Sequence, residues 1–299
     1  MAGYINFLKK KSRFKAWLLV FFLLLATIPL LLISNQIFFA KLLGVIFVTL
    51  ISIALWRWRT QTVRDIVRVS RIKMTLNEKF WLDRHIPFYY NLSKSDKKIF
   101  EDRIGLFLAE IRITEIDKEV PEKDVCLYVA SAAIIAYWGL PYWNYGELSE
   151  VLVYPDNFTD ENTISSTGTV IGKVHHGGLM DSTMILSLKA LIQGFKTPKD
   201  GQNVGIHEFS HLLDKGDGVL DGAPCMMNQK NKTIWFALLN DEIKNSRERK
   251  SDIDSYGVPD KVEFFAVLME YYREKPETLK KNHPLLFDYL SSFFVNNMD

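Results

Sequence analysis

Cysteine is scarce in this chain, whose 299 residues include only Cys126 and Cys225. That scarcity excludes a scaffold built on disulfide bonds and a zinc site built on cysteines, and it fits a reducing compartment. The sequence also lacks an internal repeat and a flexible linker, and 48% of its residues are hydrophobic against 24% charged. This composition favours a folded protein with a sizeable core over a disordered one.

A large net charge is absent as well, because the formal total is +2. The charges are nevertheless unevenly distributed along the chain. Residues 1–73 contain 12 Lys and Arg and a single acid, Asp65, whereas the remainder contains 25 Lys and Arg against 34 Asp and Glu. An acidic body of this kind argues against a nucleic-acid partner. The sequence therefore predicts two parts, residues 1–73 and a folded domain at 74–299.

The first part contains two long apolar runs. Residues 16–33 carry no charge, and residues 37–56 carry only Lys41. Since a helix needs about 20 apolar residues to cross a bilayer, we expect a two-helix transmembrane hairpin that turns at 34–36. Basic residues flank both ends of the hairpin, which predicts a multi-pass protein of the bacterial inner membrane with its body on the cytoplasmic side.

A cleaved signal peptide is the alternative interpretation of the first run. The run is long for a signal peptide, and the second run would then stay unexplained. After the hairpin, Arg64, Arg68 and Arg71 recur at helical spacing. This pattern fits either a helix lying on anionic headgroups or a solvated linker helix.

The body alternates predicted helices with a few short strands. The pattern at 96–111 follows Ser95 and has acids in its first turn, as helix starts do. Further helices are expected near 121–138, 188–195, 204–213, 233–245, 261–275 and 284–296, and strands at 112–116, 150–154, 168–174 and 183–187. Since no linker divides this region, we predict a single α+β domain with few strands and many helices.

The most informative segment is a His-Glu-x-x-His pattern formed by His207, Glu208 and His211 on a predicted helix that stops at Gly216. Four residues advance a helix by about 400°, so the two histidines lie one turn apart on the same face. Their imidazoles can bind one tetrahedral Zn²⁺ at about 2.0–2.1 Å, and Glu208 can reach a water molecule activated by the ion without ligating the metal. Chance alone produces such a pattern in about one chain in a hundred of this length.

A catalytic zinc ion usually has a third protein ligand. No histidine follows shortly after His211, so a carboxylate is the alternative. Glu263, Glu270 and Glu274 form a stripe on the predicted helix at 261–275, among aromatic residues. Partly buried carboxylates need a partner, although Glu270 and Glu274 also fit a solvated acidic stripe.

Several ordered motifs in this chain resemble the zinc metallopeptidases related to Mlc titration factor A, whose metal site is similar to that of anthrax lethal factor. The motifs are HEFSHLLD, DGAP, IDSYG and DKVEFFAVLMEYYREKP, with VLVYPDNF and MILSL upstream. The resemblance runs from about Phe88 to Phe294. It implies a zincin-like domain with a gluzincin-type HExxH…E site, a zinc cofactor and hydrolysis of peptide bonds.

The resemblance also assigns roles to individual residues. It implies that the metal ligands are His207, His211 and Glu263, and that Glu208 is the general base. Tyr256 of IDSYG matches the family tyrosine near the metal. Its phenol would donate a hydrogen bond to the oxyanion of a tetrahedral intermediate. The alternative is that it contacts the metal ligands and holds them in position without touching the substrate.

This chain departs from the family pattern at a few positions. Leu188 stands where the family commonly has Trp, and His175 and His176 form an unusual pair, of which at most one can face a substrate if they lie in a strand. Asp214 comes one turn after His211, where it either orients an imidazole or serves a structural purpose.

The sequence thus predicts a membrane-tethered zinc peptidase that acts on a peptide or protein substrate. The alternative is a regulatory binding protein that sequesters a transcription regulator or a membrane partner, as the resemblance also suggests. A binding protein does not require a base and three ligands, so their presence favours the enzyme.

Overall fold

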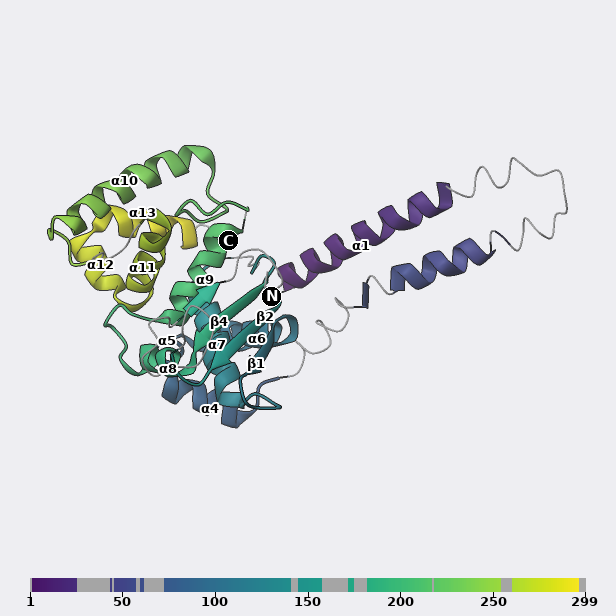
Figure 1. Cartoon of the computed structure of the whole chain (residues 1–299), viewed down its shortest axis with the longest axis horizontal. Helices are drawn as coiled ribbons and strands as arrows, with labels where there is room; N and C mark the ends of the chain where they lie inside the picture. Colours follow the sequence, from purple (N-terminus) through teal and green to yellow (C-terminus); the bar gives the residue numbers. More distant parts are fainter. Residues whose placement is uncertain are drawn as a thin grey trace. The chain divides into compact units, whose positions relative to one another are not determined.

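The computed structural model of this chain describes residues 2–25, 44, 46–57, 60–61, 73–140, 145–157, 172–174, 182–216, 218–253 and 260–295. The chain separates into two compact units, Met1–Ile72 and Lys73–Asp299. The first unit contains α1 (Ala2–Leu25) and a helical stretch at 46–57 (Figure 1). The second unit contains the sheet and the remaining labelled helices.

The prediction of a transmembrane hairpin, and with it of a multi-pass inner-membrane protein, is wrong on the described residues. None of the helices described for this chain is both long enough and apolar enough to cross a membrane. The physical reason is visible in α1, because any 18 consecutive residues of this helix include Lys9, Lys10, Lys11, Arg13 and Lys15. Its apolar part, 16–25, extends about 15 Å at helical rise, half of a hydrocarbon core of about 30 Å.

The remainder of the first apolar run and the basic stretch that carries Arg64, Arg68 and Arg71 lie outside the described residues.

In the second unit, the elements follow one another in this order: α4 (Leu76–His85), α5 (Pro87–Tyr90), α6 (Lys94–Glu110), β1 (Arg112–Glu115), α7 (Lys123–Ala136), β2 (Glu150–Tyr154), β3 (Gly172–Val174), β4 (Thr183–Ser187), α8 (Leu188–Lys196), α9 (Val204–Lys215), α10 (Gln229–Arg247), α11 (Lys261–Glu274), α12 (Pro276–Asn282) and α13 (Pro284–Val295). This order is consistent with the predicted α+β class.

The described strands form one sheet in the order β1-β2-β4-β3. β1 pairs with β2 and β2 pairs with β4 in parallel, whereas β3 runs antiparallel to β4. The register sets Val151 opposite Met184 and Val153 opposite Leu186, and all four side chains are fully buried. β3 therefore lies at the end of the strand order, next to β4.

The helix that carries both histidines, α9, lies between the sheet and the C-terminal helices (Figure 1). It packs against α7, α8 and α11 and contacts β3 and β4. Phe209 of α9 is fully buried and meets the rings of Phe107 and Tyr145 edge-on. A Cβ atom at Gly205 would lie 2.5 Å from the Cβ of Ala132, so only glycine allows α9 and α7 to approach this closely.

The C-terminal helices are joined through the carboxylate of Asp252. It accepts hydrogen bonds from the Tyr271 hydroxyl and from the side chains of His283 and Asn282, the last at 2.8 Å. Burial alone would raise the pKa of Asp252, but these hydrogen bonds outweigh burial and lower the pKa from 3.8 to about 2. The carboxylate is therefore ionised in the folded protein over the whole physiological range.

Candidate metal centre

The helix α9 begins at a side-chain cap that fixes its first turn. The Asn203 Oδ1 atom accepts a hydrogen bond from the Ile206 amide at 3.2 Å, which satisfies one of the free donors at the helix start. His207 follows in this turn and His211 lies one turn later. The two ring centroids are 4.9 Å apart, with an angle of 81° between the ring planes. Both imidazoles thus lie on one face of α9, as the spacing predicts.

The helix α11 brings a carboxylate to these rings from a distant part of the chain. The side chain of Asp260 caps α11 by accepting from the amides of Val262 and Glu263. This cap places Glu263 in the first turn of α11. Its Oε2 atom lies 3.2 Å from the Nε2 atom of His207, and its Oε1 atom lies 3.4 Å from the Nε2 atom of His211.

These distances allow a test of whether a metal ion fits. One ligand atom from each of His207, His211 and Glu263 lies within 4.8 Å of the other two. Tetrahedral bonds of about 2.0–2.1 Å would set neighbouring ligand atoms about 3.3–3.4 Å apart. Each imidazole has one oxygen of Glu263 at about this spacing, Oε2 for His207 and Oε1 for His211. Two imidazoles with one carboxylate are also a donor set that zinc accepts. The arrangement fits one ion.

The electrostatics of the site favour a positive charge between the two helices. Burial would lower the pKa of His207, but hydrogen bonds to Glu263 and Glu270 outweigh it and raise the pKa to about 10. The hydrogen bond to His207 in turn lowers the pKa of Glu263, although burial opposes this shift. Carboxylates concentrated around two imidazoles attract a cation, and a divalent metal ion supplies one.

Glu208 lies beside the ligands without belonging to the cluster. Its side chain is buried, and that burial raises its pKa to about 7, with His207 opposing the rise and Glu263 adding to it. A Cβ atom at Gly172 of β3 would lie 2.5 Å from the Glu208 Oε1 atom. The absence of a side chain at Gly172 therefore makes room for the carboxylate of Glu208 under β3.

Glu270 is a residue of this site whose role the sequence left open. Its side chain is only 9% exposed, which rules out a solvated acidic stripe at this position. The Nδ1 atom of His207 lies 2.7 Å from Glu270 Oε1, and the Asn203 amide donates to Glu270 Oε2. The signal that could have identified it is the spacing of seven residues from Glu263, which places both carboxylates on one face of α11.

Of the other site residues predicted from the sequence, one has a structural role and the rest lie outside the described residues. Asp214 is fully buried, and its two oxygens accept hydrogen bonds from the amides of Asp221, at 3.1 Å, and Gly222, at 2.8 Å. It thereby anchors the loop that follows α9. Tyr256 and the pair His175 and His176 lie outside the described residues.

The fold and the cluster of two histidines and a glutamate define a metallopeptidase-like domain, and comparison with known proteins supports this class. The model of the glucose-regulated metallo-peptidase M90 family matches residues 55–295. The chain belongs to this family. The resemblance found in the sequence is thereby confirmed, and a metal ion is implied for the site.

Individual relatives cover different shares of the chain. An uncharacterized protein of Synechocystis sp. is 30% identical over 223 residues, which cover 71% of this chain and 81% of that protein. Mlc titration factor A of Pectobacterium atrosepticum is 30% identical over 158 residues, which cover 48% of this chain and 58% of that protein. Mlc titration factor A of Salmonella agona is 26% identical over 260 residues, covering 80% and 90%.

Proposed function

We propose that this protein is a zinc-dependent peptidase whose metal ligands are His207, His211 and Glu263. The observation that carries the proposal is the convergence of these three ligand atoms within 4.8 Å, since they come from two helices that are separate in the sequence. The matched metallo-peptidase family supports the same reaction class. The substrate is then a peptide or a protein.

The residues of this chain divide the chemistry among them. Two imidazoles and the carboxylate of Glu263 hold the ion. When bound, Zn²⁺ supplies a Lewis acid that polarises a carbonyl group and makes water more acidic. Glu208 accepts a proton from the attacking water at a carboxylate oxygen and passes it to the departing amine. The absence of a side chain at Gly172 leaves room for that carboxylate.

Tyr256 completes the proposal as a residue whose role the family resemblance implies. Its phenol would donate a hydrogen bond to the oxyanion of the tetrahedral intermediate. Replacing it in Tyr256→Phe removes only the hydroxyl group. We expect the variant to keep zinc and to lose kcat, and a variant with normal kcat would restrict Tyr256 to a supporting role.

The proposal is tested by measuring the zinc content and the hydrolysis of fluorogenic peptides for the full chain. We expect Glu208→Gln to retain zinc and to lose about 10²–10⁴-fold in kcat, because its amide cannot accept the proton. His211→Ala should lose both zinc and activity. The matched control is Glu277→Gln on α12, an exposed glutamate that should change neither quantity. Full activity in purified Glu208→Gln, or a wild-type chain without zinc, would contradict the proposal.

A second candidate function is the binding of a transcription regulator, which is favoured by the name Mlc titration factor A carried by several relatives. The two functions make different demands on the metal. Binding of a purified Mlc-type repressor by His211→Ala, with wild-type affinity, would support this second function. If the wild-type chain does not bind the repressor, this second function is excluded.

A further inference from the structure

The two carboxylates on one face of α11 contact the same imidazole from opposite sides. Glu263 faces the Nε2 atom of His207, whereas Glu270 Oε1 lies 2.7 Å from its Nδ1 atom. Seven residues advance a helix by about 700°, which returns to within about 20° of the same direction. One helix therefore supplies an acceptor at each nitrogen of the ring.

We propose that Glu270 is the positioning residue for the metal ligand His207, an inference that rests on the metal site of the proposed function. An imidazole that binds a metal ion has given up its second proton, so it carries one N–H group and offers a lone pair on its other nitrogen. With Glu270 accepting from Nδ1–H, the lone pair lies on Nε2, the atom that faces Glu263. Glu270 thus selects both the tautomer and the direction of the ring that a metal ion needs.

The second oxygen of Glu270 ties the same carboxylate to the start of α9. Its Oε2 atom accepts from the backbone amide of Asn203, the residue whose side chain caps α9. His207 lies in the turn that this cap fixes. Glu270 therefore holds α11, which carries Glu263, against the turn of α9 that carries His207.

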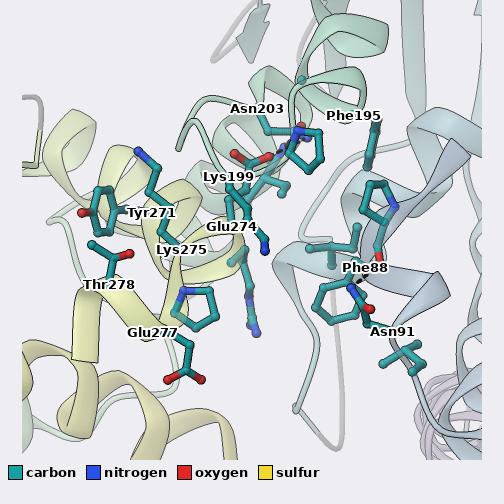
Figure 2. Close-up of a pocket in the computed structure, with 18 of the residues that line it drawn as sticks. Phe88, Asn91, Phe195, Lys199, Asn203, Tyr271, Glu274, Lys275, Glu277 and Thr278 are labelled. Atoms are coloured by element: carbon teal, nitrogen blue, oxygen red, sulfur yellow. Dashed lines mark hydrogen bonds between the residues drawn. The ribbon is translucent and has the colours of Figure 1, made fainter. Parts of the chain in front are cut away.

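The alternative for Glu270 is a purely structural one, in which the buried carboxylate joins two helices and has no effect on the ring. Glu274 offers a matched control for it. It lies one turn further along α11 and accepts from the Gly201 amide at 3.0 Å and from the Asn203 side chain at 3.4 Å. Both Glu274 and Asn203 line a cavity of about 670 Å³ (Figure 2). Glu274 thus makes the structural contact to the same segment, and its described hydrogen bonds do not involve His207.

The experiment compares Glu270→Gln with Glu274→Gln in the full chain, by competition with a zinc chelator and without any substrate. Glutamine has the shape of glutamate but only one acceptor oxygen. Its amide nitrogen must then face either the Nδ1–H of His207 or the amide of Asn203, both of which are donors. We expect zinc affinity to fall about 10–100-fold in Glu270→Gln and to change less than about two-fold in Glu274→Gln.

A second measurement uses the wild-type chain, so its result does not depend on whether Glu270→Gln folds. Nitrogen NMR of the zinc-loaded wild-type chain should show His207 protonated at Nδ1 and bound to zinc through Nε2. The variant Glu270→Asp, which keeps both oxygens but is one methylene shorter, should recover part of the affinity lost in Glu270→Gln.

Several results would overturn the inference that Glu270 positions His207. Wild-type zinc affinity in Glu270→Gln, an equal loss in Glu274→Gln, or zinc bound through Nδ1 of His207 would overturn the inference. A wild-type chain that binds no zinc would overturn the inference and the proposed function together. A chain that binds zinc and cleaves no peptide would overturn only the peptidase, because the affinity measurement requires no catalysis.

Discussion

The contact between Gly172 and Glu208 leads to a prediction that distinguishes the proposed role of Glu208 as general base from that of the proposed metal ligands. A Cβ atom at Gly172 would lie 2.5 Å from Glu208 Oε1 and 2.7 Å from both Glu208 Cγ and Val204 Cγ2. Ordinary contacts of this kind are 3.4–4 Å long, so Gly172→Ala must displace the carboxylate by about 1 Å. The atoms in the way belong to side chains, and the glutamate can move at its flexible end.

The expected consequence is a loss of activity with the metal site intact. A displacement of about 1 Å at a reacting group can cost about 10²-fold in rate. We therefore expect kcat/KM for a fluorogenic peptide to fall about 10²-fold in Gly172→Ala, with wild-type zinc content. Overpacking at Val204 should lower the free energy of unfolding by about 1–3 kcal/mol. The assays are steady-state kinetics, zinc analysis and denaturation on one preparation.

A double-mutant cycle provides the control. Glu208→Asp withdraws the carboxylate by one methylene and leaves room for the added methyl group. The loss caused by Gly172→Ala should therefore be smaller in the Glu208→Asp background than in the wild-type background. Equal losses in both backgrounds, or wild-type kcat/KM in Gly172→Ala, would refute the reasoning about this contact.

Three further predictions concern stability. Because the folded pKa of Asp252 is about 2 against an ordinary 3.8, its contribution is complete above pH 4 and is lost as the pH falls toward 2. Screening of this partly exposed group reduces that contribution to about 1 kcal/mol, so wild type should lose about 1 kcal/mol more than Asp252→Asn between pH 5 and pH 2.5 in urea denaturation. Asn203→Ala, which removes the cap of α9, should cost about 1 kcal/mol in the same assay, and an unchanged midpoint would contradict the cap. Zinc at a hundred times its Kd should raise the free energy of unfolding by about 2.7 kcal/mol in wild type and leave His211→Ala unaffected.

The sequence was most informative where periodicity and short-range chemistry decide the structure. The predicted helix at 204–213 corresponds to α9, and Gly216 does follow its last turn. This glycine does not adopt the left-handed conformation that often ends a helix, because its φ is −59°. It instead makes room for Cys225, whose Sγ atom would lie 2.4 Å from a Cβ atom at this position. Ser93, and not Ser95, caps α6: its Oγ atom accepts a hydrogen bond from the Asp96 amide at 3.2 Å.

Contacts between distant parts of the chain could not be predicted in this way. The stripe on α11 offered Glu263, Glu270 and Glu274 as candidate carboxylates, but it could not show which of them reach His207, because that depends on how α11 packs against α9. The hairpin prediction treated 16–33 as a span separate from its basic flank, whereas α1 begins at Ala2 and includes the basic residues of 9–15. Local hydropathy does not indicate where a helix begins.

In the proposed site, one zinc ion is held by two imidazoles and a distant carboxylate. A crystal structure of the zinc-loaded chain, with anomalous differences recorded at the zinc edge, tests it most directly. We expect one peak about 2.0–2.2 Å from His207 Nε2, His211 Nε2 and a carboxylate oxygen of Glu263. A zinc ion that is not coordinated by Glu263, or a zinc ion bound elsewhere in the chain, would contradict the proposed site.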